Sequence, residues 1–359
     1  MAGLVHQGTD PIDNERSDHA AKEAAKQKLA EQARIESDLV FEKIAGRWLE
    51  YYEADGRRPS SVAMAKLVVN SHLLPALRGK VVPKLAASDF KAVIDAIPAK
   101  QRGMRRAVYA YSSTFLSWAV DEGHITDKPL AGVRKPAAPE SRDRVLSEDE
   151  LAAIWSATVR VNAPFGAFFR LLILTAQRRS EVAGLDWSEL NRKSGIWSLP
   201  SERAKNGIAH DVPLVPAVVA ELDALAGGDK WPKKGFVFTT TGKTAISGIS
   251  KAKLALDRIV ARRGWTDGAT EGEEEPIAPW RIHDLRRTAA TGFQSLGVRF
   301  EVTEAVLNHL SGARAGVAGI YQRHEWKDEK RSALDAWARH VQALGSPSAT
   351  DNVVSMVAA

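Results

Sequence analysis

The sequence contains no cysteine among its 359 residues. This absence excludes disulfide bonds, thiolate metal sites and a cysteine nucleophile. No apolar run approaches the roughly 20 residues that are needed to span a bilayer, and the N-terminus lacks the basic-then-apolar order of a signal peptide. We therefore expect a cytoplasmic protein without membrane contact.

Three common catalytic motifs are also missing. Thr241-Gly242-Lys243-Thr244 resembles the end of a phosphate-binding loop, but Val237 stands where the first glycine is required. His324-Glu325 could open a zinc-binding helix, but Asp328 stands where the second histidine is required. No Gly-x-Ser-x-Gly elbow occurs either. These three motifs therefore do not account for the function.

The composition favours two domains and an acidic partner. A chain of 359 residues with 44% hydrophobic content can bury a full core in each of two domains. Lys and Arg outnumber Asp and Glu by 50 to 44, which gives a formal net charge of +6. A basic balance of this kind suits a nucleic acid, although many basic proteins never bind one.

The first third of the chain predicts an all-helical domain. Residues 1–37 read as a turn-rich opening followed by a solvated connector helix over 18–37. Residues 38–125 show helical spacing of apolar side chains from Phe41, with further helices near 60–72, 87–97 and 101–122 and a break at Leu74-Pro75. Its loops carry basic residues that are either a solvated face or DNA-binding candidates: Arg57, Arg58, Lys100, Arg102, Arg105 and Arg106.

A proline-rich linker over 126–144 separates this domain from a second one over 145–343, and residues 344–359 read as a flexible tail. The second domain begins with a capping box, Ser147-Glu148-Asp149-Glu150. Helices are predicted over 147–158, 163–185, 215–226, 247–263, 283–296, 301–309 and 326–343. Two strand-like stretches, 195–200 and 210–214, predict a β-hairpin with Asn206-Gly207 near its tip, and 266–279 reads as a surface loop. The fold class is thus mainly α with a small β-sheet.

Six conspicuous polar residues lie in this second domain. They are Arg178, Lys205, His283, Arg286, His309 and Tyr321. Singly, each has a simpler interpretation: Arg178 could pair with Glu181 on a helix face, and His309 could be a buried core histidine. Together, two arginines, two histidines and a lysine beside a tyrosine suit a phosphodiester, because guanidinium groups bind two phosphate oxygens at once.

These residues stand in four ordered boxes that resemble the tyrosine recombinase family, in particular the integrases of prophages and genomic islands. The boxes are Thr175 to Trp187, Lys205 to Leu214, His283 to Thr288, and Leu307 to Tyr321. The resemblance extends to the first domain through Trp118-Ala-Val and Gly123-His-Ile125, so that it covers roughly 40–343. Ala176 and Asn308 stand where the family usually has glycine, which implies two slightly altered turns.

The resemblance implies a mechanism. Tyr321 would attack a backbone phosphate and form a 3′-phosphotyrosyl bond, which stores the energy of the cleaved bond and makes ATP unnecessary. His283 would be the base, and Lys205 on its hairpin would protonate the departing 5′-oxygen.

The resemblance assigns the phosphate to the other residues. Arg178 and Arg286, with His309, would hold its oxygens. Glu181 would support Arg178. Neither a cofactor nor a metal ion is implied by this mechanism.

The resemblance also implies partners. A SAM-like core-binding domain over 38–125 and the catalytic domain would form a C-shaped clamp on a double-stranded attachment site. A homotetramer would assemble through exchange of the C-terminal helix, whose apolar stripe is Trp326, Leu334, Trp337, Val341 and Leu344, unless that stripe packs on its own domain. A directionality factor and a place at the bacterial nucleoid are further expectations.

Two matters stay open at this point. The segment Gly8 to Arg16 resembles one that follows an N-terminal arm-type DNA-binding domain in related integrases, so the chain is either a truncation or a member lacking that domain. Topoisomerase-like relaxation, an inactive DNA-binding protein and a basic structural protein are the rival functions. Strand exchange between two marked sites and dependence on Tyr321 would separate them.

Overall fold

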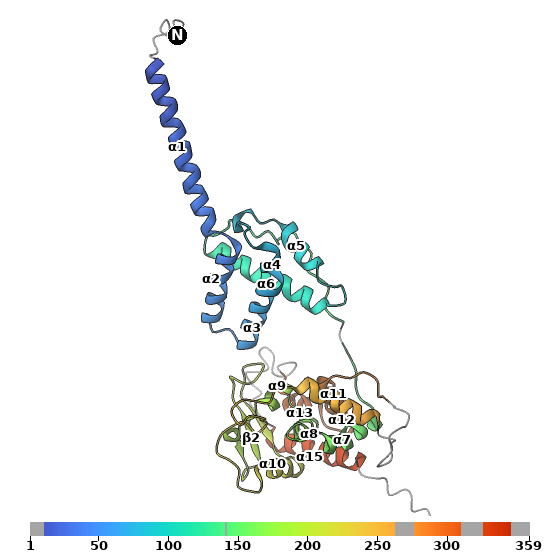
Figure 1. Ribbon diagram of the computed structural model, residues 1–359. Helices are drawn as coiled ribbons and strands as arrows, with labels where there is room; N and C mark the ends of the chain where they lie inside the picture. The colour runs from blue at the N-terminus through green and yellow to red at the C-terminus, as the bar shows by residue number, and fades with distance from the viewer. Residues whose placement is uncertain (1–10, 141, 263–275, 310–325, 346–359) are drawn as a thin grey trace, which may run out of the picture. The chain divides into compact units, whose positions relative to one another are not determined.

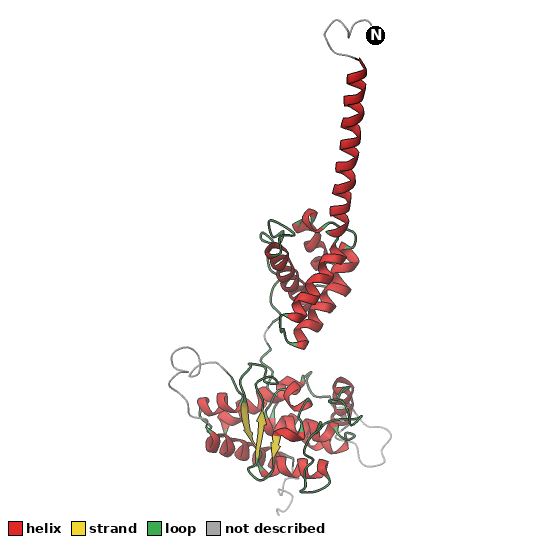
Figure 2. Cartoon of the chain, turned by 90° about the vertical axis from the view of Figure 1, so that its left-hand side faces the viewer, coloured by secondary structure: helices red, strands yellow, loops and turns green. Residues whose placement is uncertain are grey.

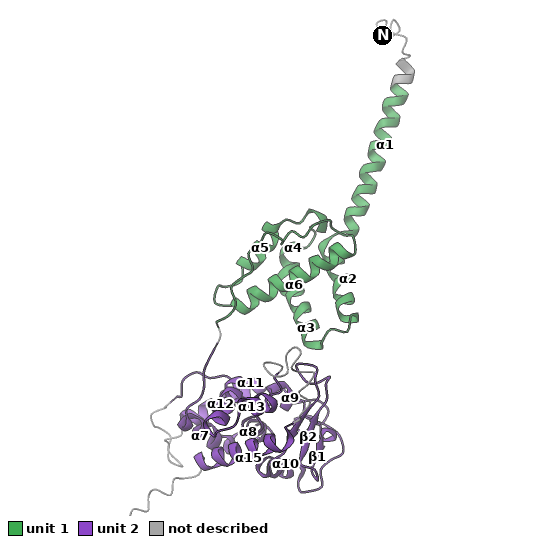
Figure 3. Ribbon diagram, turned by 180° about the vertical axis from the view of Figure 1, so that it is seen from behind, with its two compact units in different colours: residues 1–141 green, residues 142–359 purple. Residues whose placement is uncertain are grey.

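The computed structural model describes residues 11–140, 142–262, 276–309 and 326–345. The chain divides into two compact units, residues 1–141 and 142–359 (Figure 3). Both units are helical, and the second adds one three-stranded antiparallel sheet (Figures 1 and 2). The predicted fold class, mainly α with a small β-sheet, is confirmed. Tyr321 lies outside the described residues.

The first unit begins with a long exposed helix, α1 (Pro11–Asp38). The prediction that this helix starts at residue 18 after a turn-rich opening was wrong. Proline is a favoured first residue of a helix, because its fixed φ suits the first turn and its missing amide would have no partner there. Side chains over 15–35 are exposed, so the prediction that this helix is solvated is confirmed.

The core of the first unit is built from α2 (Phe41–Ala54), α3 (Pro59–Val68), α5 (Ala87–Asp95) and α6 (Arg102–Asp121), joined in part by the 3₁₀ turn η3 (Val82–Lys84). Aromatic rings lock α2 to α6: the Phe115 ring lies 5.4 Å from that of Phe41 and 5.7 Å from that of Trp48, both edge to face. Such pairs add roughly 0.5–1.5 kcal/mol beyond the burial of their area.

The break predicted at Leu74-Pro75 is absent. The helix instead passes from α3 through the π-helical segment η2 (Val69–Leu73) into α4 (Leu74–Leu77). The amide of Leu74 donates to Val69 O, five residues back. The wider π turn accommodates Pro75, which has no amide to donate, without ending the helix.

The first helix of the second unit begins as predicted. Helix α7 (Glu148–Ala157) starts at the capping box, in which the Ser147 hydroxyl accepts from the amide of Glu150 at 3.2 Å and the Glu150 carboxylate accepts from the amide of Ser147 at 2.9 Å. A 3₁₀ turn, η4 (Thr158–Arg160), follows. Reciprocal bonds of this kind satisfy two amides that the first helical turn leaves without partners.

The single helix predicted over 163–185 is divided in two. Helix α8 (Phe165–Thr175) is buried on nearly all sides, and α9 (Arg179–Ala183) follows a break at Ala176, whose φ is +54°. The apolar side chains of this run predict a buried helix but not where that helix ends. The resemblance implied a turn at Ala176, and this turn ends α8 and directs the chain toward the site.

The predicted hairpin is confirmed and gains a strand. Strands β2 (Ile196–Leu199) and β3 (His210–Pro213) pair antiparallel with Leu199 opposite His210, and β1 (Leu190–Asn191), which follows the 3₁₀ turn η5 (Trp187–Glu189), pairs with the other edge of β2. Residues 200–209 form the loop between β2 and β3, and Gly207 N closes a turn in it on Ala204 O at 3.0 Å. Lys205 and Asn206 lie in this turn.

The remaining helices are α10 (Pro216–Ala226), α11 (Ile249–Ala261), α12 (Ile282–Ser295), α13 (Phe300–Val306) and α15 (Lys327–Leu344), close to the predicted ranges. The surface loop predicted over 266–279 lies mostly outside the described residues.

The apolar stripe of α15 packs on its own unit. Leu334, Trp337 and Val341 are each at most 1% exposed, and Trp337 Nε1 donates to Ile173 O of α8 at 2.8 Å. We expected this stripe to dock on a neighbouring subunit unless it packed on its own domain. Leu334, Trp337 and Val341 follow the second alternative, because they close the core that α8 and α12 share.

Candidate active site

Arg178 owes its place to the break between α8 and α9. After left-handed Ala176, the chain runs through Gln177, whose amide group donates to Thr175 O and Val306 O, both at 2.9 Å. Arg178 is extended (φ −71°, ψ 144°) and caps α9, with its side chain 15% exposed. The guanidinium is thereby directed at the loop after α13, where Nη2 donates to Asn308 O at 3.3 Å.

Glu181 is the buried carboxylate that holds this arginine. Its oxygens accept from Arg178 N at 3.0 Å and from Arg178 Nη1 at 2.9 Å, and its side chain has no exposed surface. Its Oε1 also accepts from the amide of Lys205 at 3.4 Å, and its backbone carbonyl accepts from Arg203 Nη2 at 2.6 Å. Glu181 therefore links Arg178 to the loop that carries Lys205.

Arg286 reaches the same place from α12. Its Nη1 donates to Ala176 O at 2.7 Å, and its Nη2 donates to Leu307 O and lies 3.2 Å from His309 Nε2. Burial and the nearby charge of Arg178 lower the pKa of Arg286 to about 9. The guanidinium is still charged at neutral pH, and two such groups side by side favour an incoming anion.

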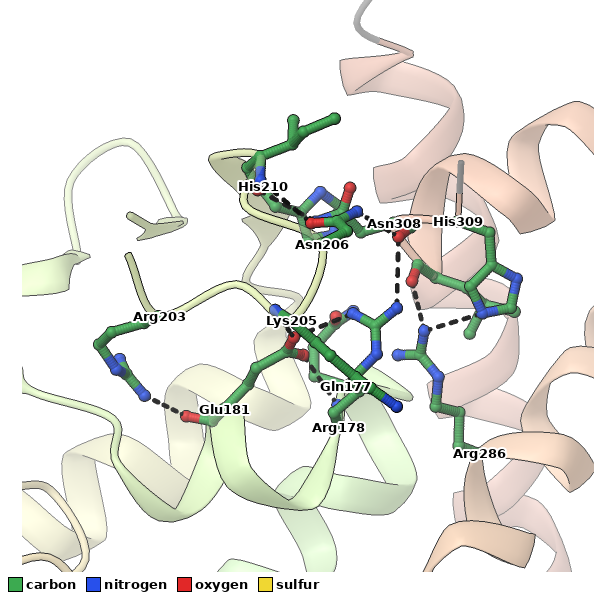
Figure 4. A network of polar contacts seen from close by, with 12 residues as sticks. Gln177, Arg178, Glu181, Arg203, Lys205, Asn206, His210, Arg286, Asn308 and His309 are labelled. Carbon is green, nitrogen blue, oxygen red and sulfur yellow. Dashed lines mark hydrogen bonds and ion pairs between the residues drawn. The ribbon is translucent and has the colours of Figure 1, made fainter. Parts of the chain in front are cut away.

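His309 follows α13 and a second left-handed residue, Asn308, with φ +48°. Its Nδ1 lies 2.8 Å from Glu304 Oε1, and its Nε2 faces the guanidinium of Arg286. The ring is therefore held from both sides. Figure 4 shows His309 and Arg286 on one side of the cluster and Arg178 with Glu181 on the other.

The loop over 200–209 closes the cluster. Asn206 Nδ2 donates to Asn308 O at 2.9 Å, and the imidazole of buried His210 lies 3.1 Å from Val306 O. Figure 4 shows the Lys205 side chain directed from this loop toward the two arginines. The charge of Lys205 also contributes to lowering the pKa of His283, which places the ammonium within electrostatic range of that ring.

His283 lies in the first turn of α12, three residues before Arg286 and thus on the same helix face. Partial desolvation, and then the charges of Arg286 and Arg287, lower the pKa of His283 below its ordinary value, although Asp284 opposes the shift. The ring is consequently neutral at pH 7, which is the form that can accept a proton.

Of the six residues that the sequence singled out, five lie on four segments that converge. Arg178 and Arg286 both bond to the Leu307–Asn308 stretch, His309 contacts Arg286, and the Lys205 loop and the first turn of α12 flank them. Tyr321, the sixth, lies outside the described residues. Within the described residues no group of three His, Asp or Glu side chains could hold a metal ion, and no helix there is long and apolar enough to cross a bilayer.

Several residues at the site escaped sequence reasoning. They are Gln177, Arg203, Asn206, Glu304 and Asn308 in its side-chain role. Asn206 was predicted as a turn residue near the hairpin tip, but its bond to Asn308 O was not. Glu304 gave no signal, because a glutamate on a helix is ordinarily solvated.

The six basic candidates of the first unit are mostly engaged within it. Arg57 lies 2.8 Å from Asp55, Arg102 lies 2.7 Å from Glu140, and Arg105 also pairs with a carboxylate, that of Asp95. Arg106 donates to Pro136 O at 3.3 Å. Arg58 is exposed but is not without a partner in the structure, and Lys100 is exposed. A DNA phosphate would have to compete with these partners or add to them.

Comparison with known proteins identifies the family. Residues 144–325, half of the chain, match the description "Phage integrase family". The chain belongs to this family of tyrosine recombinases, and the second unit is its family domain. The resemblance inferred from the four boxes is thus confirmed.

Individual relatives agree. Prophage integrase IntF of Escherichia coli K12 is 29% identical over 190 residues, which cover 51% of this chain and 37% of IntF. Prophage integrase IntZ of the same strain is 22% identical over 351 residues, which cover 95% of this chain and 78% of IntZ. The chain thus spans little more than a third of IntF.

Among solved structures, a lambda integrase tetramer bound to a Holliday junction is similar, with a TM-score of 0.59 and 17% sequence identity. The match covers 81% of this chain and 87% of that one. At this identity the similarity shows a shared fold.

Proposed function

We propose that this protein is a site-specific DNA recombinase that cleaves and rejoins DNA through a covalent bond to Tyr321. The observation that carries the proposal is the convergence of Arg178, which caps α9, and Arg286 of α12 on the Leu307–Asn308 stretch beside His309. Their guanidinium groups donate here to backbone carbonyls. A phosphate that displaced those carbonyls would receive charge-assisted bonds from both arginines.

The chemistry is an in-line exchange at phosphorus. The Tyr321 hydroxyl loses its proton to His283 and its oxygen bonds to the phosphorus, while the bond from phosphorus to the 5′-oxygen breaks. Lys205 gives a proton to that leaving oxygen. Arg178, Arg286 and His309 bind the non-bridging oxygens as negative charge grows on them. The reverse sequence, with a 5′-hydroxyl from another strand, completes the exchange.

The larger assembly is part of the same proposal. Residues 38–125 would be the core-binding domain, 126–144 a linker and 145–343 the catalytic domain, with the basic residues of the first unit contacting DNA phosphates. Exchange between two duplexes needs four active sites, and lambda integrase has been described as a tetramer on a Holliday junction. Integration or excision of a mobile element at the bacterial nucleoid, aided by an accessory directionality factor, would follow.

A nicked suicide substrate tests the proposal. Such a duplex carries the target site with a nick just beyond the scissile phosphate, so that the short 5′ fragment leaves and traps the covalent complex. We expect an adduct with the wild-type protein that resists denaturation, and none with Tyr321→Phe. Arg286→Lys tests the role of the guanidinium group, because lysine keeps the positive charge but lacks the planar donors that bind two phosphate oxygens at once. An adduct that persists after Tyr321→Phe would refute the assignment.

A further inference from the structure

Two asparagines fasten the Lys205 loop to the residue before His309. Asn206 Nδ2 donates to Asn308 O at 2.9 Å, and Asn308 Nδ2 donates in return to Asn206 Oδ1 at 3.3 Å and to Ile208 O at 3.3 Å. Asn206 Oδ1 also accepts from the amide of Ile208 at 3.1 Å. We call this reciprocal arrangement the Asn206–Asn308 clasp, and Figure 4 shows it above the two arginines.

The side chain of Asn308 is not required by its backbone. With φ at +48°, the position would suit glycine better, because glycine adopts this region without strain. Asn308 is only 1% exposed, so its amide has been withdrawn from water. A buried amide is tolerated when its hydrogen bonds are satisfied, and here its two donors go to the loop. The side chain therefore serves the loop.

The clasp acts directly beside Lys205. On one side of Lys205, Ala204 is 1% exposed and held in the core. On the other side, Asn206 is held by the clasp, and the amide of Lys205 itself donates to the buried carboxylate of Glu181. The main chain is thus fixed at Lys205 itself and at the residue on either side of it. Its exposed side chain starts from a defined point relative to Asn308 and Arg178.

The geometry points to Asn206 and Asn308 as positioning residues that hold Lys205 over the scissile phosphate for protonation of the leaving 5′-oxygen. This inference rests on the proposed function. Neither asparagine touches a reacting atom. Each acts through Lys205, because a general acid must lie within hydrogen-bond reach of the atom that it protonates and a small displacement is costly.

A substrate with sulfur in place of the 5′-bridging oxygen isolates this role. When the bond from phosphorus to oxygen breaks, the alkoxide must receive a proton. When a bond from phosphorus to sulfur breaks, a thiolate leaves, and because a thiol ionises near pH 8.5 it needs no general acid. A defect confined to Lys205 placement therefore appears with the oxygen substrate and disappears with the sulfur substrate.

The experiment compares Asn308→Gly and Asn206→Ala with the wild type in single-turnover cleavage of both suicide substrates. Asn308→Gly keeps the backbone conformation and the carbonyl that Arg178 uses, and removes only the amide. We expect each variant to cleave the oxygen substrate about 10- to 100-fold more slowly, the scale of a small misplacement. Cleavage of the sulfur substrate should stay within about threefold of the wild-type rate, which is less than the slowing expected with the oxygen substrate. The double variant should be no slower than the slower single variant, since both break one clasp.

Asn191→Ala is the matched control. Asn191 is an exposed asparagine whose Oδ1 accepts from the amide of Ser194 at 3.0 Å and closes the turn between β1 and β2, away from the cluster. Both substrates should be cleaved at the wild-type rate by this variant.

The outcomes separate the two proposals. If the clasp variants are slowed equally on both substrates, the asparagines serve the fold or DNA binding and the inference is overturned. Unchanged cleavage of the oxygen substrate overturns it as well. If the wild-type protein forms no adduct with either substrate, the proposed function itself has failed.

Discussion

His309 Nδ1 lies 2.8 Å from the carboxylate of Glu304, one helical turn earlier in the chain. On the other side of the ring, Nε2 lies 3.2 Å from Nη2 of Arg286. A guanidinium nitrogen can only donate, so Nε2 accepts and Nδ1 carries the proton toward Glu304. The carboxylate thereby fixes the tautomer and the orientation of the ring.

Glu304 should therefore matter for cleavage although it does not reach the phosphate. We expect Glu304→Ala to slow single-turnover cleavage by about 10- to 100-fold, the range known for carboxylate partners of metal-binding histidines. Glu304→Gln, which keeps an acceptor but loses the charge, should fall between. Glu301→Gln on the exposed side of α13 is the control. Wild-type rates for Glu304→Ala would show that the ring needs no such partner.

The pH dependence of cleavage should report His283. Desolvation and the charges of Arg286 and Arg287 lower the pKa of this ring below its ordinary value, so it becomes protonated at lower pH than a solvated histidine does. A base must be neutral to accept the tyrosine proton, so the rate should be lost as pH falls, with a midpoint below the ordinary histidine pKa. Measured at subsaturating DNA, the acid limb reflects the free protein.

A substitution at Arg287 should move that limb. Arg287 Nη1 also pairs with Asp284 Oδ1 at 2.9 Å, so Arg287→Gln removes one positive charge and releases a carboxylate near the ring. Both changes raise the pKa of His283 and should shift the acid limb to higher pH. A limb that does not respond to Arg287→Gln would assign the titration to another group.

Glu181 should be important for stability as well as for cleavage. Its carboxylate is fully buried and accepts from two nitrogens of Arg178. Removal by Glu181→Ala leaves the guanidinium short of its partner, at a cost of about 3–5 kcal/mol in the free energy of unfolding. Urea denaturation followed by tryptophan fluorescence measures this loss. The exposed Glu202→Gln should change the free energy of unfolding by less than about 0.5 kcal/mol, as for an ordinary surface substitution.

Local signals in the sequence predicted much of the fold. The capping box at Ser147 and the alternation on either side of Asn206-Gly207 act within a few residues, so α7 and the hairpin were located correctly. The helix predicted over 163–185 ran through Ala176, although the resemblance implied a turn there, because an alanine in the left-handed region costs about 1–2 kcal/mol and local propensity does not favour it. Burial of α8 and the bond from Arg286 to Ala176 O offset that cost, and neither is visible locally.

The site was predictable only in its charged members. Arginines and histidines in ordered boxes are conspicuous, whereas the groups that orient them are ordinary residues from distant segments. Asn206 and Asn308 are 102 positions apart, and Glu304 looks like any helical glutamate. The catalytic roles of the six residues remain predictions, which the experiments above test.

Helix α12 carries His283 and Arg286, and its packing on α15 should limit what its one interior glycine can become. A Cβ added at Gly292 would lie 2.2 Å from Cζ3 of Trp337. This ring is 1% exposed, and its Nε1 donates to Ile173 O, so it has no room to withdraw. Gly292→Ala should therefore destabilise the second unit by about 1–3 kcal/mol through overpacking, although alanine favours a helix.

Gly46, which is also a glycine inside a helix, is the opposite case. It lies inside α2, and a Cβ added there would meet nothing within 4 Å. Gly46→Ala should therefore stabilise the first unit by about 0.5–1 kcal/mol, because only the gain in helix propensity remains. Calorimetry of the two variants measures the expected increase and the expected decrease in stability.

Gly292→Ala should also slow cleavage, because α12 must shift to admit the methyl group. A wild-type rate and a wild-type unfolding temperature would mean that α12 and α15 pack less tightly than their contacts indicate.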